Sequence, residues 1–259
     1  MNAHSLPSAT PPSMGLDGRV ALLTGAAGGV GRATAALLLA HGARLVVEDR
    51  DPAVRELADA APDAVVALVG DVADENLAAR AVATAVDTFG SLDILVNNAG
   101  RTLNKTILDT SVAEFDGLHE TNARGTFVHT REALRVMQPA RSGAIVNVAS
   151  MVSTVALPLL SAYAASKGAI AQLTKVAALE VASEGIRVNA IAAGVIETGI
   201  LDEIVEDGRE ALRQAGTESP IGRAARPAEI AEAIAWVASP RASYITGALI
   251  PVDGGYTTV

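Results

Sequence analysis

Short apolar runs along the chain alternate with longer segments of helical periodicity. Strands that are apolar on both sides of the pleat and separated by helices are typical of a parallel sheet covered on both faces. A further apolar run follows a predicted helix around residues 228–238 and supplies a seventh strand. The predicted strands are Val20–Thr24, Arg44–Glu48, Val65–Val69, Ile94–Asn97, Ala144–Val148, Arg187–Ile191 and Ala248–Val252. The pattern predicts a doubly wound α/β fold, in which ligands bind beyond the carboxyl ends of the strands.

The same pattern predicts a single catalytic domain over residues 18–259. The chain has 259 residues, half of them hydrophobic, which is enough to bury one full core. Residues 1–17 carry prolines at positions 7, 11 and 12 and several serines, and they offer too little apolar surface to offset the entropy of ordering. We therefore expect a flexible tail before the domain.

Composition and charge narrow the possible functions. A formal net charge of −9 repels phosphate backbones, and 3% aromatic residues leave little surface for base stacking, so nucleic acid is not an expected partner. No uncharged apolar run reaches the ~18 residues of a membrane span, and no secretion signal is evident. Without cysteine, the chain is expected to be cytoplasmic. The four histidines form no paired ligand set, so no catalytic metal is predicted.

A glycine-rich segment follows the first predicted strand. Gly25, Gly28, Gly29 and Gly31, with Val30 between the last two, precede a helical pattern. Small residues let the backbone approach a phosphate, and the free N–H groups of a helix N-terminus attract the anion. The spacing differs from G-x-G-x-x-G, so a merely tight turn remains an alternative to a pyrophosphate site.

Acidic residues end the second and third predicted strands. Asp49 lies 24 residues beyond Gly25, near the spacing at which a carboxylate accepts the adenosine ribose hydroxyls. A 2′-phosphate would be repelled there, so NAD is favoured over NADP. Arg50 could pair with such a phosphate, pack over the adenine or point to solvent. Asp71, followed by Val72, could accept from the adenine amino group or cap the next helix.

Tyr163 and Lys167 lie one helical turn apart in a segment of alanines and short aliphatics. The ordinary tyrosine pKa near 10 leaves about one phenol in a thousand ionised at pH 7. An ammonium within about 4–6 Å is expected to lower that pKa and make the phenol a general base near neutral pH. Taken alone, a pair at this spacing would be an ordinary exposed one.

The motifs taken together resemble the short-chain dehydrogenase/reductase superfamily in its short single-domain form. The resemblance covers residues 18–255 and implies a seven-stranded Rossmann fold that transfers hydride between a nicotinamide cofactor and an alcohol or ketone. It rests on Thr24-Gly25-x-x-x-Gly29-x-Gly31, Asn97-Asn98-Ala99-Gly100, Asn122, Ser150, Tyr163-x-x-x-Lys167, Gly222-Arg223, Ile245-Thr246-Gly247 and Val252-Asp253-Gly254-Gly255.

The resemblance implies roles for four catalytic residues. Tyr163 exchanges the proton with the substrate, and Lys167 also binds the nicotinamide ribose. Ser150 ends a predicted strand thirteen residues before Tyr163, and its hydroxyl can donate to the substrate oxygen. Asn122 holds a water that connects the lysine to a proton relay; a polar residue that bends a helix is the alternative. Nearby rivals of Ser150 are Ser153, Ser161 and Ser166.

Further cofactor contacts come from the same resemblance. Asn98, Ala99 and Gly100 brace the sheet and border the adenosine, while Ile196 and Thr198 meet the carboxamide and the phosphates. The family usually has Pro-Gly where this chain has Ala193-Gly194. Losing the proline raises unfolded-state entropy and is expected to loosen the loop beside the nicotinamide.

The residues around the predicted site favour a secondary alcohol or ketone with an apolar part. Substrate contacts are expected from Ser150, Met151, Leu157 and Tyr163, and Gly199–Glu218 forms a flexible cover. Arg101 could clamp a carboxylate or point outward. Val152, Leu159, Leu160 and Leu103 complete the apolar wall.

Assembly and two competing functions complete the expectations. Helices around 112–137 and 162–184 are apolar on more than one face, and in the family they build a four-helix interface, so a homotetramer is expected. One alternative function is an NADPH-dependent carbonyl or 3-oxoacyl reductase. The other is a cofactor-sensing protein that retains the fold without turnover.

Overall fold

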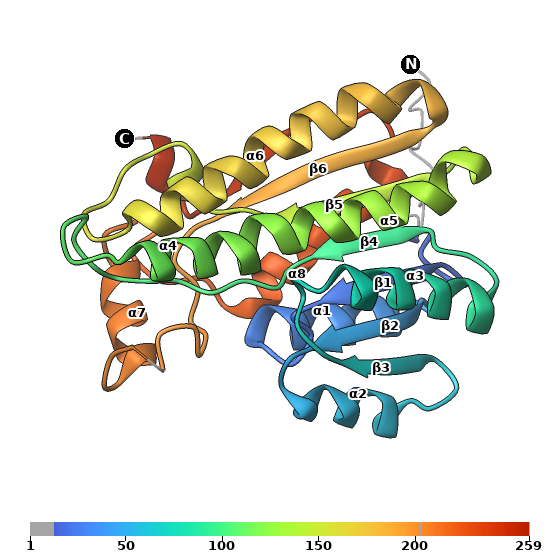
Figure 1. The fold of residues 1–259 in the computed structure, drawn as a ribbon, viewed down its shortest axis with the longest axis horizontal. Helices are drawn as coiled ribbons and strands as arrows, with labels where there is room; N and C mark the ends of the chain where they lie inside the picture. Colours follow the sequence, from blue (N-terminus) through green and yellow to red (C-terminus); the bar gives the residue numbers. More distant parts are fainter. Residues whose placement is uncertain (1–12, 203, 259) are drawn as a thin grey trace, which may run out of the picture.

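The computed structural model describes residues 13–202 and 204–258 of the chain (Figure 1). Its centre is one parallel sheet in the order β3-β2-β1-β4-β5-β6-β7. The chain runs from β1 outward to β3 and then crosses to β4 on the other side of β1. This confirms the predicted doubly wound sheet, with its switch point between β1 and β4. The strands are β1 (Val20–Thr24), β2 (Arg44–Asp49), β3 (Val65–Val69), β4 (Ile94–Asn97), β5 (Gly143–Val148), β6 (Ile186–Ala193) and β7 (Leu249–Val252).

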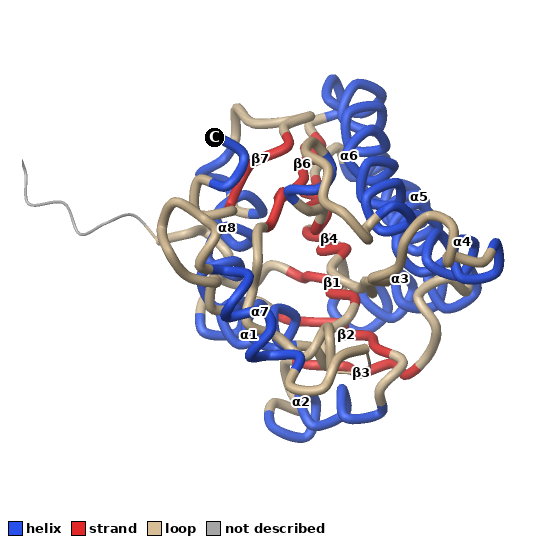
Figure 2. Tube along the Cα trace, turned by 90° about the vertical axis from the view of Figure 1, so that its left-hand side faces the viewer, coloured by secondary structure: helices blue, strands red, loops and turns tan. Residues whose placement is uncertain are grey.

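Helices cover both faces of the sheet. Figure 2 shows α3, α4, α5 and α6 on one side of the strands, with α1 and α8 on the other. The helices are α1 (Gly29–Ala40), α2 (Arg55–Ala60), α3 (Glu75–Phe89), α4 (Val112–His119), α5 (Gly125–Ala140), α6 (Ser161–Val181), α7 (Gly208–Gly216) and α8 (Pro227–Ala238). In the described ranges 13–202 and 204–258, no helix is both long and apolar enough to cross a membrane.

The two faces of the sheet pack into two main hydrophobic cores. Leu23 belongs to the core under α1 and α8, whereas its neighbour Leu22 belongs to the core under α3, α5 and α6. Both side chains are fully buried, and burying a leucine stabilises a fold by about 2 kcal/mol. Double-sided burial explains why the strand sequences are continuously apolar rather than alternating.

The packed region reaches back into the segment expected to be a tail. Leu16 is buried in the core beside α1 and α8, and Met14 packs against that core. Residues 1–12 of the expected tail lie outside the described residues. Packing therefore begins before residue 18.

Two segments near the site differ from expectation. Ala193 is the last residue of β6 and pairs with Val252, so this position is part of the sheet and not of a loosened loop. The next residue must be glycine, because a Cβ on Gly194 would lie 2.6 Å from the Cα of Asp253. The helix expected over residues 112–137 is divided into α4 and α5 by a π-helical turn, Glu120–Arg124. Such a turn is common at functional sites.

Candidate functional site

The glycine-rich turn joins β1 to α1 at the carboxyl edge of the sheet. Gly25 has φ +67°, and a Cβ there would lie 2.7 Å from the Cα of Ala99. A Cβ on Gly31 would collide with the carbonyl oxygen of Gly25. Gly25 therefore allows the close approach of the β1 and β4 ends, and Gly31 allows the turn to pack against the start of α1.

The first turn of α1 is suited to an anion. It contains no acidic residue, and no side chain caps it, so its N–H groups are not neutralised locally. Gly28 and Gly29 are exposed there. Thr198 lies against the turn, because a Cβ on Gly29 would be 3.2 Å from its Cγ2. Val30 is buried in the core, so only its backbone faces the turn.

The Asn-Asn-Ala-Gly segment braces the switch point. The backbone N–H groups of Asn98 and Ala99 both donate to Thr24 Oγ1 at 3.0 Å. The Asn98 side chain donates to the carbonyl oxygen of Gly25 at 2.9 Å. These bonds tie the end of β4 to the glycine-rich turn, as the expected bracing role requires.

Asp49 is held at the end of β2 beside that turn. Its two carboxylate oxygens accept the N–H groups of Ala27, at 2.9 Å, and Asp51, at 3.0 Å. A carboxylate oxygen has more than one acceptor position, so each can still accept from a ribose hydroxyl. The neighbouring Arg50 is exposed.

The residues after β3 line the same end of the site. Asp71 accepts the N–H of Ala73 at 2.8 Å, while Asp74 caps α3 by accepting from Asn76. The alternative in which Asp71 caps α3 is therefore wrong, because Asp74 occupies that position. Val72 packs against α5, since a Cβ on Gly125 would lie 2.9 Å from its Cγ1.

Ser150 and Tyr163 meet at the end of β5. Ser150 is buried directly beyond the strand, and its hydroxyl is hydrogen-bonded with the phenol of Tyr163. The hydroxyl of Ser153 donates to the carbonyl oxygen of Lys167, and that of Ser166 donates to the carbonyl oxygen of Tyr163. Two of the three rivals, Ser153 and Ser166, are thus engaged by the backbone of α6.

Lys167 is buried on the same face of α6. Its Nζ donates to the carbonyl oxygen of Val148 at 2.7 Å and lies 5.8 Å from the centroid of the Tyr163 ring. A Cβ on Gly100 would lie 3.3 Å from both Lys167 Nζ and Asn122 Oδ1. Glycine at position 100 therefore leaves room for the ammonium and the amide on one side of the chain.

Asn122 is positioned by the π-helical turn and is fully buried. Its amide donates to Ser166 Oγ at 2.9 Å and to the carbonyl oxygen of Arg101 at 3.0 Å, and its Oδ1 accepts the N–H of Arg101. Ser166 thus bridges Asn122 to α6. Sequence reasoning missed this bridge; the signal for it was a serine three residues after Tyr163.

The electrostatics of the pair differ from the expectation. Burial raises the pKa of Tyr163 above its ordinary value, and the hydrogen bond with Ser150 opposes the rise only in part. Burial also lowers the pKa of Lys167 to about 8. The net shift of the Tyr163 pKa is therefore upward and not downward as expected, because loss of solvation outweighs the hydrogen bond with Ser150. At neutral pH the phenol carries its proton and the lysine is still mainly charged.

Two loops border the expected substrate side. Met151 and Val152 are buried, Leu157 is half-buried, and the N–H of Lys105 donates to the carbonyl oxygen of Leu159 at 2.9 Å. This bond joins the loop after β4 to the loop before α6.

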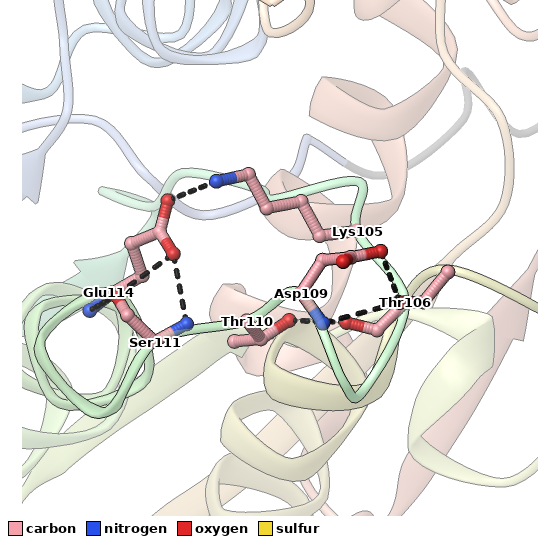
Figure 3. Close-up of polar contacts among 6 residues, drawn as sticks. All are labelled: Lys105, Thr106, Asp109, Thr110, Ser111 and Glu114. Carbon is pink, nitrogen blue, oxygen red and sulfur yellow. Dashed lines mark hydrogen bonds and ion pairs between the residues drawn. The ribbon is translucent and has the colours of Figure 1, made fainter.

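The loop after β4 is braced internally. Figure 3 shows Lys105 paired with Glu114, whose carboxylate also closes the cap of α4 at Ser111. The hydrogen bond from Lys105 lowers the pKa of Glu114 to about 2. Thr106 and Asp109 close the turn between them. The loop therefore presents a fixed backbone beside the substrate side.

The expected cover, Gly199–Glu218, contains α7, which stands outside the two helical layers in Figure 1. Arg213 on α7 forms ion pairs with Glu210 and with Glu197, the residue between Ile196 and Thr198. The cover is thus linked to the segment assigned to the cofactor. In the described part of the chain, no group of three His, Cys, Asp or Glu side chains could hold a metal ion.

Known proteins match the chain over almost its whole described length. A family described as enoyl-(acyl carrier protein) reductase matches residues 25–257. The chain is 44% identical to cis-4-hydroxycyclohexanecarboxylate dehydrogenase of Sinomonas cyclohexanicum, over 93% of this chain and 97% of that protein. It is 38% identical to 3-oxoacyl-[acyl-carrier-protein] reductase FabG of Thermotoga maritima, over 93% and 99%. The solved structure of ElxO with NADP bound superposes with a TM-score of 0.86 at 29% identity, covering 93% of this chain and 99% of that one.

Proposed function

The chain belongs to the short-chain dehydrogenase/reductase superfamily and is an oxidoreductase, and we propose that it transfers hydride between NAD(H) and a secondary alcohol or ketone with an apolar part. One observation carries the proposal. Ser150, Tyr163, Lys167 and Asn122 converge from three different elements at the sheet edge that also holds the glycine-rich turn. A protein that only sensed a cofactor would not need this set.

The residues of the turn fit a nicotinamide dinucleotide. The uncapped first turn of α1 offers N–H groups to the pyrophosphate, and Thr198 lies beside it. Asp49 offers oriented oxygens to the ribose, and the Lys167 ammonium uses one of its three hydrogens on Val148. When bound, the cofactor supplies or accepts the hydride.

Residues of the protein transfer the proton to and from the substrate oxygen. In ketone reduction, Tyr163 donates its phenolic proton to the carbonyl oxygen while Ser150 donates a hydrogen bond to the same oxygen. A raised pKa keeps the phenol protonated and ready for this step. Alcohol oxidation requires the phenolate, stabilised by Lys167. We therefore propose that oxidation gains rate as the pH rises.

Asp49 supports NAD over NADP. Its carboxylate is fixed by two backbone N–H groups, so it cannot easily swing away from a 2′-phosphate. ElxO, which is similar in structure, was solved with NADP bound, and the proposal of NAD for this chain rests on Asp49. We expect the wild-type enzyme to prefer NAD when both cofactors are supplied at equal concentration.

Replacement of Asp49 tests the preference directly. We expect Asp49→Ser to raise the KM for NAD about tenfold and to lower the KM for NADP, because it removes both the ribose acceptor and the repulsion of the 2′-phosphate. Steady-state kinetics with each cofactor measures both changes. A wild-type preference for NADP would overturn the assignment.

The substrate side favours an alcohol with an apolar part. Met151, Val152 and Leu157 offer no charge to a substrate. The similarity to a hydroxycyclohexanecarboxylate dehydrogenase supports a cyclic alcohol, and the similarity to FabG supports a 3-oxoacyl chain as the second candidate. A panel of cyclic alcohols and 3-oxoacyl thioesters, followed by NADH and NADPH absorbance, separates the two.

We also propose a homotetramer. Large apolar side chains are exposed on the loop before α4 and on α4, α5 and α6, at Ile107, Leu108, Val112, Phe115, Phe127, Val176 and Leu179. A patch of this kind on a protein surface marks an interface. We expect sedimentation equilibrium to give four times the mass of one chain and Phe115→Asp to reduce it. A wild-type protein that sediments as a monomer would contradict the proposal.

A further inference from the structure

A buried acid–imidazole pair joins β2 to α5 and has no part in the proton transfer proposed above. Glu48 and His129 are 1% and 0% exposed, and His129 Nε2 lies 2.9 Å from Glu48 Oε1. The contact has the distance of an ion pair, and neither atom forms a hydrogen bond of regular geometry with any described residue. The sequence interval between the two residues is long, so only the fold brings them together.

The contacts of His129 require a proton between the two groups. Its Nδ1 lies 3.0 Å from the carbonyl oxygen of Gly125, and a carbonyl only accepts, so Nδ1 carries a hydrogen. If Nε2 were bare, two acceptors would face each other at 2.9 Å. One further proton must therefore be held by the Glu48–His129 pair.

The surroundings favour the shared proton. Desolvation lowers the pKa of His129, but the hydrogen bond and charge of Glu48 outweigh it, with smaller help from Gly125 and Glu132, so the net shift is upward. Glu132 is itself paired with Arg131 and Arg135. With the proton retained, neither Glu48 nor His129 is a lone buried charge.

The pair lies under the residues assigned to the adenosine. Glu48 directly precedes Asp49, and the backbone oxygen of Glu48 accepts the N–H of Ala26 in the glycine-rich turn at 3.1 Å. Gly125, which accepts from His129, packs against Val72. The pair therefore links the end of β2, which carries Asp49, to α5, which packs against Val72.

We propose that Glu48 and His129 are positioning residues for the cofactor, because their shared proton fixes the end of β2 to α5 and so holds Asp49 where it meets the adenosine ribose. This inference rests on the proposed role of Asp49. A buried ion pair seldom adds stability over apolar residues of similar size, so a role in positioning accounts for the pair better than a role in stability.

A set of variants, read by the dissociation constant of NADH in fluorescence titration, tests the proposal. Glu48→Leu and the double variant Glu48→Leu/His129→Leu remove the link, and we expect each to weaken NADH binding about five- to tenfold. Glu48→Gln is the matched control, because its amide N–H can donate to a neutral Nε2 and keep the link without the shared proton. We expect it to bind NADH within about twofold of the wild type.

The Asp49→Asn background shows whether the effect passes through Asp49. There we expect Glu48→Leu to change the dissociation constant by less than about twofold, since the group that it positions is already disabled. Equal weakening in both backgrounds, or none in either, overturns the proposal. If Asp49→Asn alone leaves NADH binding unchanged, Asp49 does not bind the ribose. The positioning role of Glu48 and His129 is then refuted as well. Circular dichroism shows whether each variant folds. If Glu48→Leu does not fold, the double variant Glu48→Leu/His129→Leu takes its place in both backgrounds, because it leaves no unpaired buried side chain.

Discussion

Replacement of Tyr163 by phenylalanine is expected to lower turnover by about a thousandfold while NADH still binds within about twofold of the wild type. Phenylalanine fills the same half-buried space and removes only the hydroxyl that exchanges the proton. Proton transfer by a positioned side chain contributes typically 10²–10⁴-fold to a rate, which sets the size of the loss. Steady-state kinetics and a fluorescence titration with NADH measure the two quantities.

The matched control for this change is Ser150→Ala. Its hydroxyl only donates a hydrogen bond to the developing charge, so we expect a smaller loss, about a hundredfold. Turnover by the Tyr163→Phe variant at more than a tenth of the wild-type rate would remove the tyrosine from the mechanism.

The second large effect is expected at Lys167, where stability and activity should move in opposite directions. We expect Lys167→Met to lower turnover by about a hundredfold or more, because the phenolate loses its cation. The same change should raise the free energy of unfolding at pH 7 by about 2 kcal/mol. The gain is the relief of the buried charge, about 3 kcal/mol, less about 1 kcal/mol for the hydrogen bond to Val148.

The pH dependence of this stabilisation follows from the pKa of the lysine. In the folded protein it is about 8, against 10.5 for an ordinary lysine. Between these values the unfolded chain holds a proton that the folded chain has lost, so wild-type stability rises with pH across the window. Below pH about 8 the destabilisation is fully present, and by pH about 10.5 it has been relieved.

Urea unfolding of both proteins at pH 7 and at pH 10 measures the difference. We expect the advantage of Lys167→Met to shrink at the higher pH. A difference that stays constant or grows would mean that the lysine is not carrying a buried charge.

The strands could be predicted because their physical cause is local. A segment such as Val20–Thr24 is buried on both faces, and its residue types alone report this. The glycine-rich turn was predictable for a similar reason, since Gly25 and Gly31 occupy positions that no side chain could share. The end of β6 was not, because its pairing through Ala193 depends on β7, far along the chain.

The site was predictable as a set of residues and not as an electrostatic environment. The spacing of Tyr163 and Lys167 placed both on one face of α6, but it could not show how deeply the fold buries them. Burial decides the direction of both pKa shifts, so the expected fall for Tyr163 became a rise. The pairing of Glu48 with His129 was not predicted, because neither residue belongs to a motif and only the fold brings the two together.

The most direct test of the account compares two titrations of the enzyme saturated with NAD. The ultraviolet difference spectrum between the wild type and Tyr163→Phe gives the pKa of the Tyr163 phenol, and the pH profile of alcohol oxidation gives the pKa of the catalytic base. With Tyr163 as the catalytic base, the two pKa values coincide in the wild type. If the rate reaches its plateau while Tyr163 is still protonated, another group takes the proton and the account is contradicted.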